Sequence, residues 1–200
     1  MMHFTGKIVG GKVLIEKNQS KAARLLEKAL SSKESESLFI VRTGVPQEIL
    51  GKAYLAGVGN LQRDDAKAER WLLEASAHGR VDATAQLGFR YLGVVESDIP
   101  VNIEKGIEFV RKAAEAGHAQ AQMLMGSLYS VGTPPLFKSG VLAADWYYRA
   151  GVSFLKMGKK DMALACVQGI QELSSKQGLS VPNGFLADKL LKMIYIGSTQ

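Results

Sequence analysis

The 200-residue sequence predicts an all-α protein built from repeated pairs of helices. Ala, Leu, Lys and Glu recur in runs such as KAARLLEKAL, and there are only five prolines, a composition that favours helices. Two short patterns also recur along the chain, always in the same order. Both keep a period of 37 or 38 residues, which is typical of stacked helical units in a solenoid.

The first pattern is an apolar residue followed by glycine, two variable positions and tyrosine. It occurs as LGKAY at 50–54, LGFRY at 87–91 and MGSLY at 125–129. The second pattern centres on an aromatic residue and occurs as KAERWLLEA at 67–75, KGIEFVRKA at 105–113 and LAADWYYRA at 142–150. Because two independent markers keep one period, residues 46–150 are predicted to form three units of two helices each.

Residues 1–45 are predicted to form a degenerate first unit. The stretch KAARLLEKA at 21–29 resembles the aromatic-centred pattern and predicts a helix that starts at Lys21. Ser20 is its predicted N-cap, because a serine oxygen accepts a hydrogen bond from a backbone N–H that has no partner inside the helix. The preceding FTGKIVGG is a poor helix former.

Local signals predict where the helices of the three units begin and end. The first helix of the first unit begins at Pro46, and that of the second unit begins after Asp82 as N-cap. These first helices are predicted to end at glycines that adopt a positive φ, namely Gly57, Gly93 and Gly132. The second helices are predicted to begin after Asp64 or Asp65, after Asn102 and near Ser139, and the first two to finish at Gly79 and Gly117.

The glycine inside each first helix has a packing explanation. Gly51, Gly88 and Gly126 each cost roughly 1 kcal/mol relative to alanine in a helix interior. A repeated cost of this kind predicts that a neighbouring helix approaches closely at this position.

The C-terminal residues 151–200 are predicted to continue the array. One long helix over 141–157 belongs both to the third unit and to a pattern with tetratricopeptide-like spacing, which runs from Tyr147 through Phe154 to Ala163. After a loop that contains Pro182, residues 184–196 predict a final helix with an apolar stripe.

The two stretches YLAGVGNLQRDDAKAERWLLEASAHG and LGFRY…NIEKGIEFVRKAAEAGHAQAQ resemble Sel1-like repeats, which are relatives of the tetratricopeptide repeat. The resemblance covers roughly residues 46–150, and the third copy departs from it in the loop GTPPLFKSG. It implies a right-handed α-α superhelical solenoid of about eight or nine helices. The whole chain, 1–200, would then be one solenoid domain with a degenerate unit at 1–45, Sel1-like repeats at 46–150, and tetratricopeptide-like and capping helices at 151–200.

The same resemblance implies a non-catalytic scaffold or adaptor that binds a protein or peptide partner in the concave groove of the repeats. The residues agree, because no catalytic, cofactor-binding or metal-binding set is apparent. Gly6, Gly11 and Lys12 fit the G-x4-G-K of a phosphate loop, but Val13 stands where a Ser or Thr should hold magnesium. His78 and His118 are expected at turns, exposed or capping, and no HExxH or GxSxG motif occurs. A hydrolase assembled from residues of different repeats is a weaker alternative.

The two variable positions between glycine and tyrosine are the candidate contact surface, because stacking leaves them free. Phe89 and Arg90 are notable, since the positions equivalent to Phe89 hold Lys52 and Ser127. The predicted partner-binding residues are Lys52, Phe89, Arg90 and Gln122. The alternative for Phe89, that its ring packs against the next unit, stays open.

Charge leaves a second class of partner open. The net charge is +6, with eight basic and four acidic residues in 1–45, nine and eleven in 46–118, and eight and four in 119–200. A nucleic-acid-binding helical repeat that uses the basic terminal segments is therefore an alternative, although a mildly basic chain kept soluble by lysine explains the same numbers.

The sequence also gives an expectation about compartment. The uncharged run from Ala116 to Phe137 contains several polar residues and two prolines, so we expect no transmembrane segment. Cys166, the single cysteine, lies in the apolar run MALACV and is expected to be buried and unpaired. With no secretory signal evident, we expect a cytoplasmic protein, and a periplasmic or secreted one if a leader precedes this sequence.

Overall fold

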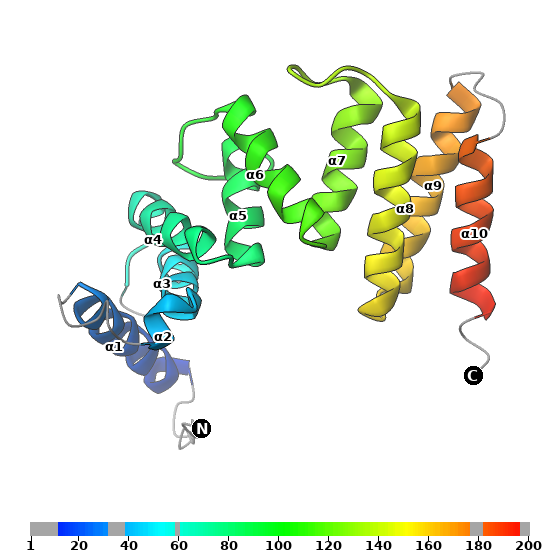
Figure 1. Ribbon diagram of the computed structural model, residues 1–200. Coiled ribbons are helices and arrows are strands. Elements are labelled where there is room, and N and C mark those ends of the chain that lie inside the picture. Colours follow the sequence, from blue (N-terminus) through cyan, green and yellow to red (C-terminus); the bar gives the residue numbers. More distant parts are fainter. Residues whose placement is uncertain (1–11, 32–38, 59–60, 177–181, 197–200) are drawn as a thin grey trace. The chain divides into compact units, whose positions relative to one another are not determined.

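Helices make up all the regular secondary structure of the computed structural model, which describes residues 12–31, 39–58, 61–176 and 182–196 (Figure 1). These ranges contain no strand, which confirms the all-α prediction. The chain divides into two compact units, residues 1–100 and 101–200, and each is described by itself. That residues 1–200 form one solenoid domain stays a prediction.

The first unit contains five helices. They are α1 (Lys12–Leu30), α2 (Phe39–Arg42), α3 (Val45–Ala56), α4 (Asp65–Ala77) and α5 (Val81–Tyr91). α3 packs against α1, α2 and α4, and α4 packs against α5. Leu50, Tyr54 and Trp71 are buried together with Ala23 of α1, so α1 shares a core with the helix pair α3–α4.

The second unit also contains five helices. They are α6 (Ile103–Glu115), α7 (Ala119–Val131), α8 (Gly140–Lys156), α9 (Lys160–Lys176) and α10 (Pro182–Ile196). α7 to α10 run alternately up and down, each beside the next (Figure 1). Phe154, Ile170 and Leu190 lie at the centre of their shared core. The described ranges contain ten helices. One of them, α2, has only four residues, and the nine longer helices agree with the expected eight or nine.

The predicted N-caps form where the sequence places them. The side chain of Asp64 accepts a hydrogen bond from Lys67 N at 2.9 Å, and that of Asn102 accepts one from Lys105 N at 3.0 Å. Ser139 caps α8 in the same way. His118 Nδ1 accepts a hydrogen bond from Ala121 N at the start of α7, so this histidine has the capping role.

The predicted terminating glycines have left-handed backbone. Gly57 and Gly132 follow α3 and α7 directly, with φ of 61° and 82°. The other glycines predicted to end helices also have a positive φ, and these are Gly79, Gly93 and Gly117. A side chain with a Cβ is strained in this conformation, which explains why glycine occupies these positions.

Three predicted boundaries were wrong. α1 begins at Lys12, so Ser20 lies inside this helix and does not cap it. KVLIEKN contains no glycine or proline, and a helix that has formed extends through such residues. Asp82 lies in the first turn of α5, after Arg80 as N-cap, and Pro182 is the first residue of α10. Gly6 and Gly11 of the phosphate-loop candidate lie outside the described residues.

Two of the three helix glycines, Gly51 and Gly126, lie at close contacts between helices, as predicted. A Cβ on Gly51 would come within 2.8 Å of Leu72 Cγ on α4. A Cβ on Gly126 would come within 2.8 Å of the Tyr147 ring on α8. Gly88 is buried in α5.

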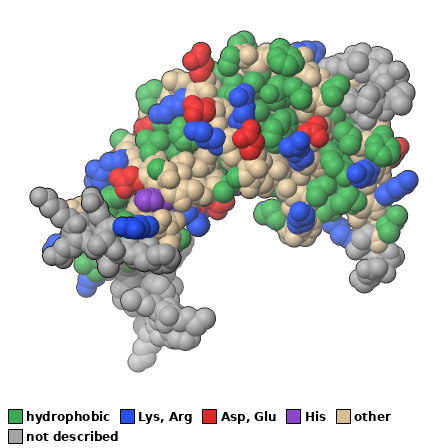
Figure 2. Space-filling view, viewed as in Figure 1, with side chains coloured by type: hydrophobic (Ala, Val, Ile, Leu, Met, Phe, Trp, Pro, Cys, Tyr) green, Lys and Arg blue, Asp and Glu red, His purple; other side chains and the backbone are tan. Residues whose placement is uncertain are grey.

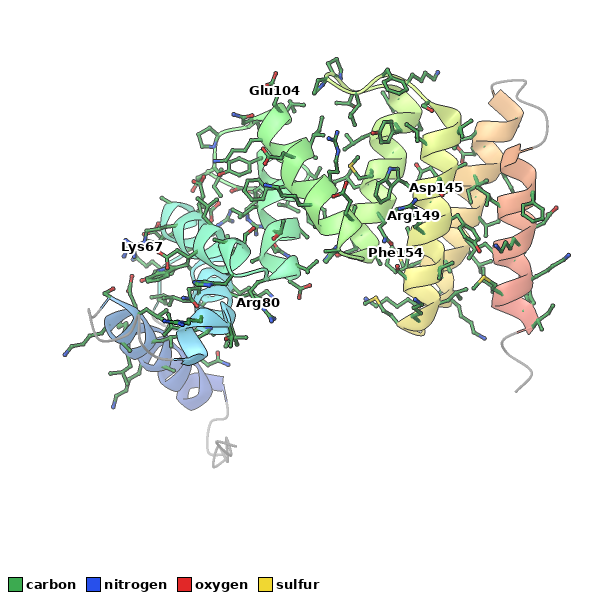
Figure 3. All side chains as sticks on the ribbon, viewed as in Figure 1. Lys67, Arg80, Glu104, Asp145, Arg149 and Phe154 are labelled. Atoms are coloured by element: carbon green, nitrogen blue, oxygen red, sulfur yellow. The ribbon has the colours of Figure 1, made fainter. Side chains whose placement is uncertain are left out.

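The aromatic residue at the centre of each second helix carries a cation on its ring. Arg70 lies over Trp71 at 4.6 Å from the ring centroid, and Arg149 lies over Trp146 at 4.9 Å. Arg149 also forms an ion pair with Asp145 at 2.9 Å, and these two residues are labelled in Figure 3. A cation above an aromatic face is attracted by the ring quadrupole, so each arginine helps to cover one face of its aromatic ring.

Candidate protein-binding groove

An apolar groove of about 440 Å³ lies between α1 and α3 in the first unit. One stripe of side chains from each helix lines it, and both stripes have the spacing i, i+3, i+4, i+7, which places them on one face of a helix. The α1 stripe is Gln19, Ala22, Ala23 and Leu26, the α3 stripe is Ile49, Lys52, Ala53 and Ala56, and Val58 lies at the end.

The two walls of the groove are joined by contacts below it. Ala23 of α1 is buried in the core that contains Tyr54 of α3. The Tyr54 hydroxyl donates a hydrogen bond to Glu27 at 2.5 Å, and Arg70 of α4 lies 4.0 Å from the same carboxylate. Burial and this contact with Glu27 raise the pKa of Tyr54 to about 12, so the hydroxyl keeps its proton and remains a donor.

The groove lining combines small and large apolar side chains. Ala22, Ala53 and Ala56 are small, and Ala22 and Ala56 are exposed. Ile49 is 55% exposed at the rim. A single exposed apolar residue is ordinary on a protein surface, but Ile49 borders a groove whose lining is mainly apolar. Small residues together with a large exposed apolar residue are suited to receive the apolar side of another chain segment.

Lys52 is the one charged residue in the groove lining. Its ammonium lies 2.5 Å from Glu48 Oε1 and 3.5 Å from Asp82 Oδ2. Arg80 Nε lies 2.5 Å from the other oxygen of Glu48. Burial alone raises the pKa of the Glu48 carboxyl, but the hydrogen bonds from Lys52 and Arg80 outweigh it and lower the pKa below its usual value. Glu48 is therefore held in its charged form as the partner of both cations.

Of the four predicted partner-binding residues, the structure places Lys52 at the groove. Its side chain is 45% exposed, and the neighbouring variable position, Ala53, also lines the groove. Arg90 is partly buried, and its Nη1 donates to the carbonyl of Gln86 at 3.0 Å and to the side-chain oxygen of Gln86. Burial lowers the pKa of the Arg90 guanidinium.

The expectation that Phe89 and Gln122 face a groove is corrected by their burial. Phe89 is only 9% exposed and is one of the buried residues of α5. Gln122 is 6% exposed and lies in the other unit. A partner contact by Lys52 and the accessible part of Arg90 stays a prediction.

Gln122 has a structural role inside the second unit. Its side-chain nitrogen donates to the Ala114 carbonyl of α6 at 3.1 Å, and the Ser153 hydroxyl of α8 donates to its side-chain oxygen at 2.8 Å. Because both ends of this buried amide are paired, Gln122 joins three consecutive helices.

The equivalent positions in the other units are also buried and polar, but their hydrogen bonds differ. Gln47 and Thr84 also lie four residues before the helix glycine, and both are buried. The Gln47 side chain donates to the Val41 carbonyl at 3.1 Å, and the Thr84 hydroxyl donates to the Arg80 carbonyl at 2.9 Å. This repeated polar position was missed in the sequence, since two different residue types, glutamine and threonine, occupy it.

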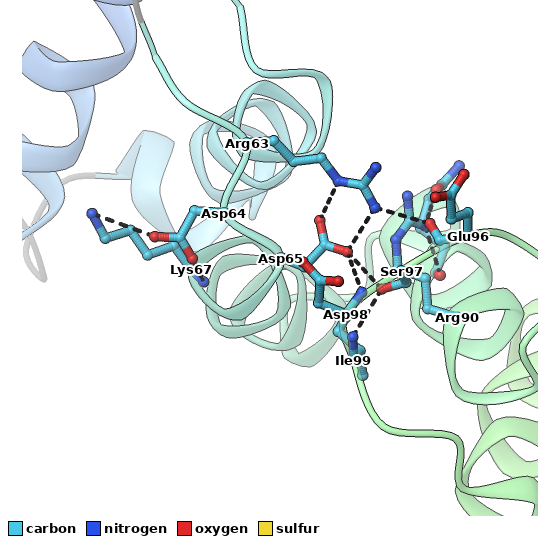
Figure 4. Close-up of polar contacts among 10 residues, drawn as sticks. Arg63, Asp64, Asp65, Lys67, Arg90, Glu96, Ser97, Asp98 and Ile99 are labelled. Carbon is cyan, nitrogen blue, oxygen red and sulfur yellow. Dashed lines mark hydrogen bonds and ion pairs between the residues drawn. The ribbon is translucent and has the colours of Figure 1, made fainter.

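A buried carboxylate organises the start of α4 (Figure 4). The Asp65 side chain is 1% exposed and accepts hydrogen bonds from Arg63 at 2.8 and 2.9 Å. The Ser97 hydroxyl and Asp98 N, which follow α5, each donate to it at 2.8 Å. The hydrogen bonds from Arg63 hold the pKa of Asp65 well below its usual range, although burial alone would raise it. With both oxygens occupied, Asp65 serves the fold.

Two findings in the described residues concern metal binding and thiol chemistry. No group of three or more His, Cys, Asp or Glu side chains in the described ranges is placed to hold a metal ion. Cys166 is buried as expected, and burial raises the pKa of its thiol to about 12, far above what a thiolate nucleophile needs. Across the same ranges, no helix has both the length and the apolar character that a bilayer crossing requires.

The repeated helix pairs and the apolar groove place this protein in the class of α-helical repeat proteins. Its described part holds no cluster of His, Cys, Asp or Glu side chains that could bind a metal ion. The family model for the Sel1 repeat matches residues 1–33, 47–79, 81–118 and 119–151, which is more than half of the chain. The chain therefore belongs to the Sel1 repeat family. Proteins of this family are generally scaffolds for protein–protein interactions, and their fold is typically non-catalytic. No curated protein sequence matches the chain.

Solved structures of Sel1 repeat proteins have the same fold. The crystal structure of a Sel1 repeat protein from Oxalobacter formigenes aligns with a TM-score of 0.54 and 24% identity over 82% of this chain and 70% of that one. A protective antigen present in uropathogenic Escherichia coli strains, which displays a Sel1-like repeat fold, aligns with a TM-score of 0.51 and 17% identity over 94% of this chain. The aligned region is 45% of the antigen's length. At these identities the likeness concerns the fold.

Proposed function

We propose that this protein is a non-catalytic scaffold that holds an apolar segment of a protein partner in the groove between α1 and α3. The observation that carries the proposal is the pair of facing stripes, one from each helix, along a groove of about 440 Å³. The family supports a role in protein binding, and the groove supplies a place for it.

The lining favours a helical segment as the bound element. Two helix faces side by side leave a straight trough, and the small side chains of Ala22, Ala53 and Ala56 let a third backbone come close. An amphipathic helix fits such a trough with apolar anchors at i, i+3, i+4 and i+7. Ile49 at the rim would then contact the partner directly, since about half of its surface is accessible.

The test is a capture experiment with one matched pair of variants. Ile49→Asp introduces a charge at the groove rim, and Val94→Asp introduces the same charge at another apolar side chain of the first unit that is also 55% exposed and does not line the groove. We expect quantitative mass spectrometry to identify protein partners whose recovery falls at least about tenfold with Ile49→Asp, roughly the loss of one good apolar anchor, and is retained with Val94→Asp.

The same experiment can contradict the proposal. If every captured protein is retained by Ile49→Asp, or if both variants lose the same proteins, the groove is not the binding site. Circular dichroism of the two variants checks that each keeps its helices, which we expect because both positions are exposed.

A further inference from the structure

The last helix of the second unit, α10, has two faces that differ in their surroundings. Ala187, Leu190 and Ile194 are buried in the core shared with α8 and α9. The opposite face carries an exposed stripe with the spacing i, i+3, i+4, i+7, i+11, here called the α10 stripe, which consists of Phe185, Asp188, Lys189, Lys192 and Ile196.

Large apolar residues lie at both ends of the α10 stripe. Phe185 at its start and Ile196 at its end are each 66% exposed. Beside Ile196, Tyr195 is 65% exposed and Met193 is 40% exposed. Four exposed large apolar side chains on a single 15-residue helix are more than the scattered exposure of an ordinary surface, and they mark an interaction site.

The middle of the stripe carries an anion and a cation that have no partner within the described chain. Asp188 and Lys192 lie one turn apart, and neither forms an ion pair with another described residue. Lys189 differs, because its ammonium lies over the Tyr148 ring of α8 at 5.2 Å from the centroid. The stripe therefore presents one available negative and one available positive charge between two apolar ends.

We propose that the α10 stripe is an interface with a second copy of this chain, in which two α10 helices pack antiparallel about a two-fold axis. In such a pair, positions equally distant from the axis lie opposite each other. With the axis near residue 190, Asp188 faces Lys192 of the partner subunit, and Phe185 meets Tyr195 of the partner subunit. Both contacts occur twice, so Asp188 and Lys192 are complementary across the axis. The two Lys189 side chains lie beside the axis, each with its ammonium over a Tyr148 ring.

The size of this interface sets the expected strength. One helix from each subunit buries less area than the roughly 1,200–2,000 Å² of a standard stable complex. We therefore expect a dimer that dissociates on dilution. The monomer has a mass of 21.6 kDa, so sedimentation equilibrium resolves it from a dimer of twice that mass.

The test is a charge exchange, measured by sedimentation equilibrium between about 1 and 300 µM protein. Asp188→Lys and Lys192→Asp each place like charges opposite one another, and we expect each to weaken the dimer at least about tenfold. The double variant Asp188→Lys with Lys192→Asp restores opposite charges across the axis, and its dimer dissociation constant should return to within about threefold of the original.

An apolar variant and a control complete the experiment. Phe185→Glu should abolish the dimer, whereas Phe137→Glu, at a 70% exposed position of the same unit outside α10, should leave it intact. The proposal is overturned if the unmodified chain is monomeric over the whole concentration range, if the double variant is no better than the single ones, or if Phe137→Glu dissociates the dimer as strongly as Phe185→Glu. This surface is separate from the groove of the first unit, so neither result bears on the proposed function.

Discussion

Asp65 shows how a buried carboxylate becomes part of the fold. Burial alone favours its protonated form. The hydrogen bonds from Arg63, together with those from Ser97 and Asp98 N, favour the charged form and outweigh the effect of burial on the pKa. The folded-state pKa of Asp65 therefore lies below the value of about 3.9 expected in the unfolded chain.

Asp65→Asn tests this balance through the pH dependence of stability. The variant leaves buried donors without a charged acceptor, so we expect urea unfolding at pH 7 to show a loss of roughly 1–3 kcal/mol. Because the folded pKa is depressed, the contribution of the carboxylate is fully present above about pH 4 and is lost as pH falls through the folded pKa. The difference between the unmodified chain and the variant should therefore shrink below about pH 4.

The neighbouring acid provides the control for that variant. Asp64 caps α4 through its side chain, and asparagine caps a helix about as well as aspartate, so Asp64→Asn should change stability by less than about 0.5 kcal/mol. If both variants lower the free energy of unfolding by the same amount, the hydrogen bonds to Asp65 add nothing to the effect of removing one negative charge.

Single residues also show where prediction from the sequence stops. Phe89 and Gln122 were expected to contact a partner, Phe89 because its position varies between repeats, yet both are buried. Gln122 shares its place in the repeat with Gln47 and Thr84: the two glutamines bond to a backbone carbonyl of an earlier helix, and Thr84 bonds to the Arg80 carbonyl one turn earlier. Variation in residue type hid this shared role, since an amide and a hydroxyl can each donate the hydrogen bond that the position requires.

At the scale of single helices, the boundaries that depend on local chemistry were predicted well. The caps at Asp64, Asn102 and Ser139 involve residues only three positions apart, so a short stretch of sequence specifies them. The start of α1 was placed nine residues too late, because Ser20 has the chemistry of a cap but the residues before it also form helix. A local rule identifies a possible start and does not show whether the helix continues upstream.

Two glycines inside helices test close packing against helix propensity. In Gly126→Ala the new Cβ meets the partly buried Tyr147 ring at 2.8–3.0 Å, and Gly169 of α9 also lies close to this ring, which leaves it little room to move. Overpacking of this kind costs about 1–3 kcal/mol, which exceeds the roughly 1 kcal/mol gained in helix propensity. We therefore expect a net loss of stability in urea or thermal unfolding.

Gly184→Ala in α10 is the matched control. A Cβ there has no neighbour within 4 Å, so only the propensity gain applies and the variant should be as stable as the unmodified chain or up to about 1 kcal/mol more stable. If Gly126→Ala also stabilises the protein, the Tyr147 ring of α8 can move aside for the new Cβ, and the predicted overpacking is wrong.

For the molecule as a whole, periodicity predicted the repeat architecture and missed the groove. The family model extends the repeats to residues 1–33, which agrees with the degenerate first unit. The α1 stripe begins at Gln19, before the predicted start of that helix, so its i, i+3, i+4, i+7 pattern was cut short in the sequence. The facing stripe on α3 lies about thirty residues further along the chain, and only packing brings the two together.

At the same scale, the distribution of charge bears on the two proposed classes of partner. Several basic side chains are already paired with carboxylates, and these include Lys52, Arg63, Arg80, Lys112 and Arg149. On the face shown in Figure 2, acidic side chains lie among the basic ones. A surface that binds nucleic acid needs unpaired cations gathered in one patch, so this arrangement favours a protein partner.

Salt and nuclease separate these two classes in one capture experiment. A protein that neutralises six to ten phosphates loses about 10³–10⁵ in affinity between 50 and 200 mM salt, because each contact releases counterions. A partner held mainly by apolar contacts in the α1–α3 groove should lose less than about threefold over the same range, since the lining contains one charged residue, Lys52, that is already paired. Capture by the full chain should also survive nuclease treatment. Partners that disappear with nuclease, or a steep loss with salt, would instead assign the basic terminal segments to nucleic acid, and Ile49→Asp would then leave the captured material unchanged.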